Sequence, residues 1–459
     1  MSPRHAILAV LTLVGTLAGA GAAAVVPASA ATAQTPDDFR DVMWVGNNWA
    51  GTATIIDENS LEVLKTGVDL VPDRAQELRD IRLDPARLAL FLLVRTLPGE
   101  GHDQFVDDMF ATTDGKHLAV SRPSLGDVVW IDVAKATSTG GPGSITREQS
   151  IDGYRTDHMA VSPDGRRLLV SDSTKRQVIE YSMVDETVGS QQIAMGDRLR
   201  TFESGETPHE SNYSDDGQRI FHASIGKVYT PYDNPKAPGH DAIKGDRWFE
   251  IVNNSDFTIA KRWQMGKELA EAGHPGMSAA VRPMALAPGE RFIYFQVSYF
   301  HGIVEFDLEA QDINNAVNYS TRTQPEPGTG AVTRLINLPK RTTVNTTGYV
   351  NDSAHHGLAM DEAGTTLCAA GTMDDYAALV DRATGTPTFF DEETTGHEYG
   401  KPYWSTEGLQ NRCWISLSEN DAVAVIDFES KEEVAYLPVG DHPQRVRHGL
   451  VPESVVATW

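Results

Sequence analysis

The stretch from residue 156 to residue 196 constrains the fold of this chain more than any other part of its sequence. It contains four short runs in which apolar and polar residues alternate, each the length of a β-strand: HMAVS, RRLLVSD, QVIEYSM and SQQIAM. Between the first two runs lies SPDG, where Asp164 can bond to the following backbone and Gly165 can adopt a positive φ, so a tight hairpin is favoured. Four antiparallel strands in one short segment leave an apolar face that they cannot bury alone, which predicts one blade of a β-propeller.

The hairpin turn recurs along the chain, as a repeated blade requires. Close copies occur at Gly115 (TTDGKHLAVS), Gly217 (SDDGQRIFHAS) and Gly364 (DEAGTTLCAAG), and weaker copies lie near Gly289 and Asn411. A second marker, apolar residues followed by an aspartate, occurs at Asp57, Asp132, Asp307, Asp381 and Asp427. Together these marks predict seven blades.

The two ends of the repeat region complement each other. Residues 43–68 supply only three strands, and residues 439–451 begin like an inner strand that no hairpin follows. We therefore expect one all-β domain over 43–451, a seven-bladed β-propeller closed by a C-terminal inner strand. Between the first two blades, residues 72–97 switch to helical spacing, with Asp84 and Pro85 placed as N-cap and first helical residue, which predicts a helical insertion.

Residues 1–33 are typical of a secretory signal peptide. Arg4 precedes an apolar stretch, and small residues at 28–30 provide a cleavage site after Ala30 or Ala33. A membrane anchor is the alternative, but the apolar run is short and diluted with Gly and Ala. The sequence therefore predicts a secreted protein without a membrane span.

Composition narrows the range of partners. The formal net charge of −25 argues against nucleic acid or an anionic membrane as a partner. A small-molecule ligand is expected, and a protein partner stays open. Cys368 and Cys413 lie in corresponding strands of consecutive predicted blades, and an export route permits a disulfide, but the sequence leaves their pairing open.

The repeated SPDG-type turn, the V-S-D-like strand and the aliphatic-Asp turn resemble those of the secreted YVTN-type seven-bladed β-propellers of bacteria, relatives of the lactonase-like propellers. The resemblance covers residues 43–451. It implies the fold rather than one function, because such propellers include enzymes, cofactor proteins and binding modules.

The positions where the inner strands enter the central channel carry different ionisable residues in different blades. Counting eight residues back from each turn glycine, or its equivalent, gives Asp107, Asp157, His209, Arg282, His356 and Tyr403, with Gln444 aligned in the closing strand. The next position gives Asp108, His158, Glu210, Pro283, Gly357, Trp404 and Arg445. Turn chemistry does not require such an irregular ring. Because neighbours in a strand point to opposite sides, we expect His209 and Glu210 to face apart.

Imidazoles and carboxylates that converge in a recess can hold a divalent metal ion and activate water, or act as acid and base. The predicted catalytic residues are His209, His356, Asp157 and Glu210, and the predicted metal ligands are His209, His356 and Asp157. The predicted ligand-binding residues are Asp107, Asp108, His158, Arg282, Tyr403, Trp404 and Arg445. In particular, Arg282 and Arg445 could bind an anionic ligand bidentately.

Three functions stay open at this point. The first is an exported hydrolase or lyase, metal-dependent or not, with His209 and His356 at its centre. The second is a non-catalytic ligand-binding or protein-interaction propeller, whose rim contacts its partner. A copper oxidase is a third. No close-spaced metal motif such as HExxH or CxxC chooses among them.

Overall fold

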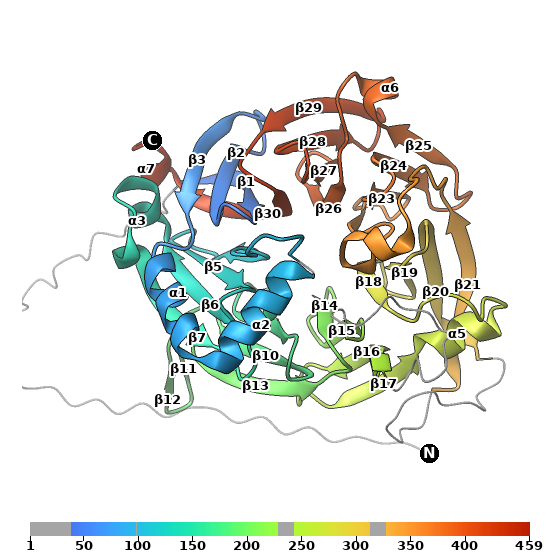
Figure 1. The fold of residues 1–459 in the computed structure, drawn as a ribbon, viewed down its shortest axis with the longest axis horizontal. Coiled ribbons are helices and arrows are strands. Elements are labelled where there is room, and N and C mark those ends of the chain that lie inside the picture. The colour runs from blue at the N-terminus through green and yellow to red at the C-terminus, as the bar shows by residue number, and fades with distance from the viewer. Residues whose placement is uncertain (1–37, 98, 228–242, 313–326) are drawn as a thin grey trace, which may run out of the picture. The chain divides into compact units, whose positions relative to one another are not determined.

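The computed structural model describes residues 38–97, 99–227, 243–312 and 327–459, and the predicted signal peptide lies outside them. Their strands form seven four-stranded antiparallel sheets and one two-stranded ribbon. The seven sheets are arranged around a common centre, as a seven-bladed β-propeller requires (Figure 1). Among the described residues, no helix is long and apolar enough to cross a membrane.

The first sheet combines both ends of the described chain. Its strands, from the centre outward, are β30 (Pro443–Pro452), β1 (Phe39–Asn47), β2 (Thr52–Asp57) and β3 (Val63–Asp69). β30 pairs antiparallel with β1 from Phe39 opposite Pro452 to Asn47 opposite Pro443. The C-terminal strand therefore occupies the inner place of the first blade.

The next three sheets follow in chain order. The second contains β4 (Met109–Ala111), β5 (His117–Arg122), β6 (Asp127–Asp132) and β7 (Ile145–Ser150). The third contains β8 (Thr156–Val161), β9 (Arg167–Asp172), β10 (Gln177–Ser182) and β13 (Arg198–Glu203). The fourth contains β14 (Pro208–Tyr213), β15 (Arg219–Ser224), β16 (Trp248–Asn253) and β17 (Ile259–Gln264).

The last three sheets complete the ring. The fifth contains β18 (Val281–Leu286), β19 (Phe292–Val297), β20 (Gly302–Gln311) and β21 (Thr329–Asn337). The sixth contains β22 (Leu358–Met360), β23 (Thr366–Gly371), β24 (Tyr376–Asp381) and β25 (Pro387–Phe390). The seventh contains β26 (Pro402–Gly408), β27 (Arg412–Leu417), β28 (Ala422–Asp427) and β29 (Glu432–Pro438).

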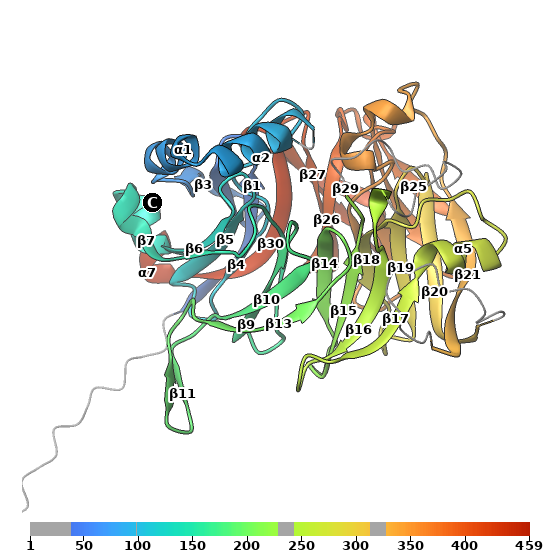
Figure 2. The ribbon, with the colours of Figure 1, turned by 60° about the horizontal axis from the view of Figure 1, so that its bottom comes forward.

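One run of the stretch at 156–196 takes a different place from the predicted one. SQQIAM does not supply the fourth strand of its blade: β12 (Gln191–Ile193) pairs only with β11 (Glu186–Val188), in a ribbon that projects from the sheets (Figure 2). The fourth strand is β13, which pairs with β10. The reason is burial, since β13 brings Phe202 into the core beside Val178, whereas the glutamines of β12 are exposed.

The turns have the predicted chemistry. In the SPDG turn, Asp164 Oδ1 accepts from Ser162 Oγ at 2.6 Å and from the Arg166 backbone N–H at 3.0 Å. Gly165 has a φ of 69°, a conformation that favours glycine. The same hydroxyl–carboxylate bond, at 2.6 Å, recurs between Thr112 and Asp114 and between Ser214 and Asp216.

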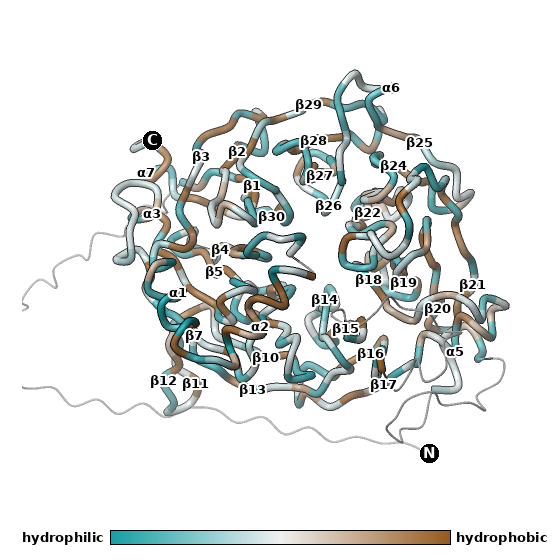
Figure 3. Tube along the Cα trace, viewed as in Figure 1, coloured by the Kyte–Doolittle hydropathy of each residue, from teal (hydrophilic) through white to brown (hydrophobic). Residues whose placement is uncertain are grey.

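The predicted helical insertion is present between the first and second blades. It consists of α1 (Arg74–Leu83) and α2 (Pro85–Thr96), and the Asp84 side chain caps α2 by accepting from the backbone N–H groups of residues 86 and 87. α2 is hydrophobic along most of its length (Figure 3) and buries Phe91 and Val94. The other helices among the described residues are short: α3 (Val133–Ser138), α5 (Met265–Glu271), α6 (Glu392–Thr395), α7 (Glu453–Val456) and the 3₁₀ turns Pro142–Ser144, Thr346–Gly348 and Val350–Asp352.

Neighbouring blades are held together by apolar packing and by one covalent link. Phe249, Trp263, Phe295 and Phe306 form an aromatic cluster between the fourth and fifth sheets. Cys368 of β23 and Cys413 of β27 form a disulfide with an S–S distance of 2.11 Å. The pairing that the sequence left open therefore joins the sixth blade to the seventh.

Candidate functional site

Every inner strand carries a β-bulge at the same place. In the first, third, fourth, fifth and seventh sheets the register slips there, so that two inner-strand residues face one residue of the next strand. In the second sheet Asp107 N donates to Ser121 O and Asp108 O accepts from Ser121 N; residues 356 and 357 bond to Ala370 in the same way in the sixth. The bulged pairs are 107–108, 157–158, 209–210, 282–283, 356–357, 403–404 and 444–445, the two positions that the sequence aligned at the rim.

A bulge re-aims side chains, and here the bulges aim them at a central cavity of about 20 Å³. The first residue of every pair lines it: Asp107, Asp157, His209, Arg282, His356, Tyr403 and Gln444. Two second-position residues, His158 and Arg445, line it as well. Strict alternation along a strand would have turned these two away, so the bulge is what adds the third imidazole. Gln104, Arg155, Ile225 and Asn351 complete the lining.

Three predicted site residues lie outside this lining and connect blades instead. Glu210 Oε2 accepts from the backbone N–H of Met284 in the next blade at 2.7 Å. Asp108 receives two bonds from the Arg447 guanidinium, both at 2.8 Å, and one from the Met159 backbone N–H at 3.0 Å. The guanidinium carbon of Arg445 lies over the Trp404 ring, 4.1 Å from the ring centroid. As predicted, Glu210 and His209 face apart.

His158, His209 and His356 form the centre of the cavity. One ring nitrogen of each lies within 4.8 Å of those of the other two. The His158 and His209 ring centroids are 3.8 Å apart, and the His356 centroid lies 6.0 and 5.7 Å from them. All three residues are buried, and the Nδ1 atom of each has no hydrogen-bond partner.

The electrostatic surroundings keep these imidazoles neutral. Burial, followed by the positive charge of Arg445, lowers the pKa of His158 and of His356 well below the ordinary histidine value. Burial and then the Arg282 guanidinium lower the pKa of His209 in the same way. A neutral imidazole offers one lone pair, which is the form that binds a metal ion. The lone pair of His158 lies on Nε2, where it accepts from the Arg445 guanidinium in this structure, so an ion there would replace that hydrogen bond.

The carboxylates of the lining are occupied by arginines. Asp157 pairs with Arg155 and accepts from Ser173 Oγ at 2.9 Å. Asp107 lies 3.2 Å from the Arg445 guanidinium, and burial raises the pKa of Asp107 to about 7. Asp157, predicted as a metal ligand, pairs with Arg155 in this structure, and its ligand atom lies within 4.8 Å of those of Asp107 and His158. His158 also completes the group of three imidazoles.

A second group of the same residue types lies behind His356. Asp374 Oδ2 is 2.5 Å from His301 Nδ1 and 3.0 Å from His355 Nε2, and these ligand atoms also lie within 4.8 Å of one another. Asp374 Oδ1 accepts from the backbone N–H groups of Arg341 at 2.7 Å and Thr342 at 2.9 Å. The group joins the fifth and sixth blades by hydrogen bonds.

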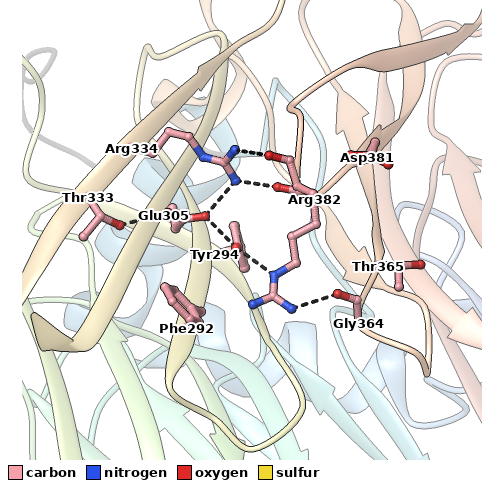
Figure 4. Close-up of a pocket in the computed structure, with 10 residues that line it drawn as sticks. Phe292, Tyr294, Glu305, Thr333, Arg334, Gly364, Thr365, Asp381 and Arg382 are labelled. Atoms are coloured by element: carbon pink, nitrogen blue, oxygen red, sulfur yellow. Dashed lines mark hydrogen bonds and ion pairs between the residues drawn. The ribbon is translucent and has the colours of Figure 1, made fainter.

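A larger cavity, about 740 Å³, lies between the fifth and sixth blades (Figure 4). Arg334 donates to Glu305 at 2.7 Å and to the Ala383 carbonyl at 3.0 Å, and Arg382 donates to Tyr294 Oη at 2.8 Å and to the Gly364 carbonyl at 2.9 Å. None of the sequence-predicted site residues lines it.

Comparisons with known proteins assign no family. No family model matches the chain, and no curated protein matches it. Among solved structures, it is similar to hydrazine synthase of Kuenenia stuttgartiensis, with 12% identity and a TM-score of 0.46 over 75% of this chain and 88% of that one. It is also similar to a periplasmic gluconolactonase of Pseudomonas aeruginosa, with 14% identity and a TM-score of 0.47 over 90% and 99%. The YVTN-type resemblance stays a prediction.

Proposed function

We propose that the central cavity binds one divalent transition-metal ion through His158, His209 and His356, and that the loaded site catalyses a hydrolase or lyase reaction on a small molecule. The observation that carries this proposal is the convergence of three buried, neutral imidazoles whose Nδ1 atoms lack partners. Buried polar atoms in folded proteins are nearly always satisfied, so such a cluster calls for a missing partner.

The size of the cavity favours a metal ion with a ligand of very few atoms over a larger organic molecule. Its volume of about 20 Å³ is somewhat above that of a single water-sized sphere. Sites for organic ligands usually measure about 300–1,000 Å³. Zinc, copper, nickel and iron all accept imidazole ligands, and three protein ligands with an open position are typical of catalytic zinc.

The surrounding groups suit proton transfer at neutral pH. A bound divalent ion would supply Lewis acidity and lower the pKa of a bound water. Asp107, whose pKa burial raises to about 7, can accept or donate a proton in this range. Tyr403, whose pKa burial raises to about 12, stays protonated and can donate a hydrogen bond. These roles support a hydrolase or lyase.

A non-catalytic role is the second candidate, and the small size of the cavity is the observation that favours it. His158, His209 and His356 come from the third, fourth and sixth blades, so an ion between them would tie three blades together. In that case the metal would stabilise the ring without turnover.

Cobalt binding tests the proposal. Purified protein titrated with Co²⁺ should bind one ion per chain, and His356→Ala should weaken binding about 100-fold or more, because one of three ligands is lost. His397→Ala is the control, since exposed His397 makes an ordinary pair with Glu433 at 2.6 Å and should bind like the wild type. A wild type that binds no Co²⁺, or equal losses in both variants, would refute the metal site.

Turnover separates the two candidates. The loaded wild type and His209→Ala would be screened against small esters, lactones and elimination substrates. Turnover by the wild type alone supports catalysis, and the absence of turnover by a loaded wild type supports the structural role.

We also propose that the chain is exported. The Cys368–Cys413 disulfide supports this, since such bonds persist in oxidising compartments. N-terminal sequencing of the mature protein tests it, with cleavage expected after Ala30 or Ala33.

A further inference from the structure

We propose that the central cavity also binds a small anion with a carboxylate-type head, held by Arg282 and Arg445 beside the three imidazoles. Its place next to a metal ion rests on the function proposed above. The anion would be the substrate's charged group or a required co-ligand.

The first argument is the charge balance of the lining. Three arginines, Arg155, Arg282 and Arg445, face the cavity together with two aspartates. Arg155 pairs with Asp157, and Arg445 pairs with Asp107 at 3.2 Å. Arg282 has no such partner: within the described part of the chain, no carboxylate oxygen lies within 4.0 Å of its guanidinium.

Neutral groups are all that hold Arg282. Its Nε donates to Ser298 Oγ at 2.9 Å, and its Nη2 donates to the Asn351 carbonyl. The residue is 1% exposed, so water does not screen its charge. Asp352 and Asp157 favour its charged form only from beyond 4.0 Å. A buried charge without a directly paired counter-charge is costly, and arginine cannot lose its proton to escape that cost.

The backbone that meets Arg282 is itself constrained. Asn351 and Asp352 have φ values of 46° and 61°, a left-handed conformation that is unfavourable for residues other than glycine. Asn351 Nδ2 also donates to Tyr403 Oη at 3.1 Å, inside the same lining. Such strain clusters at ligand sites, where surrounding contacts maintain it.

Arg445 adds unused donors to the same place. Its Nη2 contacts His158 Nε2 and Asp107, but its Nε and Nη1 are buried without partners. The charges of Arg282 and Arg445 both lower the pKa of His209 and of His356, so both guanidinium groups lie near the imidazoles. A divalent ion at the imidazoles would increase the positive excess further. A carboxylate compensates it, because the planar guanidinium fork matches its two oxygens.

The test is whether formate, the smallest carboxylate, and Co²⁺ assist each other's binding. In buffer free of carboxylate and phosphate, formate should tighten Co²⁺ binding to the wild type by about tenfold. Arg282→Gln should abolish this effect and bind Co²⁺ alone as tightly as the wild type or more tightly, because a repelling charge has gone. Arg291→Gln, at an exposed arginine paired with Asp307, should behave like the wild type.

Two results would overturn the anion site: formate without effect on the loaded wild type, or Co²⁺ binding weakened by Arg282→Gln, as a purely structural arginine predicts. If Arg282→Gln does not fold, Arg282→Lys replaces it. It keeps the charge but not the fork, and should retain Co²⁺ affinity while losing most of the formate effect.

Failure of the metal site would be distinguishable. If the wild type binds no Co²⁺, formate is titrated into the metal-free protein instead. A formate-dependent rise in Tm that Arg282→Gln removes would support the anion site on its own, and no rise would overturn it.

Discussion

The two histidine groups of this propeller contain similar residues at similar spacing and differ in how their polar atoms are satisfied. In the group behind His356, Asp374 binds His301 and His355, and His301 Nε2 is 2.9 Å from Tyr349 Oη. His355 Nδ1 is the one ring nitrogen there without a partner. In the central group, the Nδ1 atoms of all three histidines lack partners, and burial followed by the positive charges of Arg445 and Arg282 lowers the pKa values of these histidines. Asp157 Oδ1 lies 3.6 Å from His158 Nε2.

We interpret this difference as that between a structural network and the proposed binding site. The Asp374 carboxylate already receives four hydrogen bonds and joins two blades, so binding an ion would add little stability. Three neutral imidazoles beside unbalanced arginine charges would be stabilised by a metal ion that binds their lone pairs together with an anion that balances the positive charge. Proximity of histidines alone does not distinguish the two cases; hydrogen-bond satisfaction does.

Removing the hub of the structural network should have the largest effect. Asp374→Ala should lower the free energy of unfolding of the metal-free protein by about 3–5 kcal/mol, because it removes a buried carboxylate from buried His355 and leaves partly buried His301 and two backbone N–H groups without their acceptor. His356→Ala, which loses its stacking on Tyr403 and one hydrogen bond to the Tyr403 backbone, should cost about 1–2 kcal/mol. Urea denaturation measures both, and the comparison fails if His356→Ala is the more damaging change.

A smaller effect concerns pH. The pKa values of His158, His209 and His356 are lower in the folded protein than the ordinary 6.5, so below that pH the unfolded chain takes up protons that the native protein does not. Stability is therefore fully present above pH 6.5 and is lost as pH falls. His209→Gln should reduce the slope of this loss by at most about 1.4 kcal/mol per pH unit, one proton's share. Equal slopes in the wild type and in His209→Gln would contradict the buried neutral imidazoles.

Local pattern was sufficient to predict the seven blades, the helical insertion and the ring of rim positions. It predicted them because turn chemistry and period-two alternation are properties of short segments. The SQQIAM run was assigned wrongly, because only the core decides whether an alternating run or its neighbour, here β13 with Phe202, completes a sheet.

The bulge explains the main gap in the site prediction. In a regular strand the side chains of Asp157 and His158 would point to opposite sides. In the bulge both residues lie opposite Ser171, and both side chains line the cavity. The serines of β5, β9 and β27 were a signal that could have been used, since Ser121 Oγ and Ser416 Oγ accept from bulge N–H groups at 3.0 Å and Ser171 Oγ donates to His209 O at 2.6 Å. That Arg282 binds the Asn351 carbonyl instead of a carboxylate could not be predicted, because no spacing rule places the Asn351 backbone beside it.

A crystal of the wild-type protein soaked with Co²⁺ and measured by anomalous diffraction tests the central claim most directly. The account predicts one strong anomalous peak between His158, His209 and His356, and none at His301, His355 and Asp374. A peak at Asp374 with none in the central cavity would contradict it, as would a soaked crystal with no peak at either group.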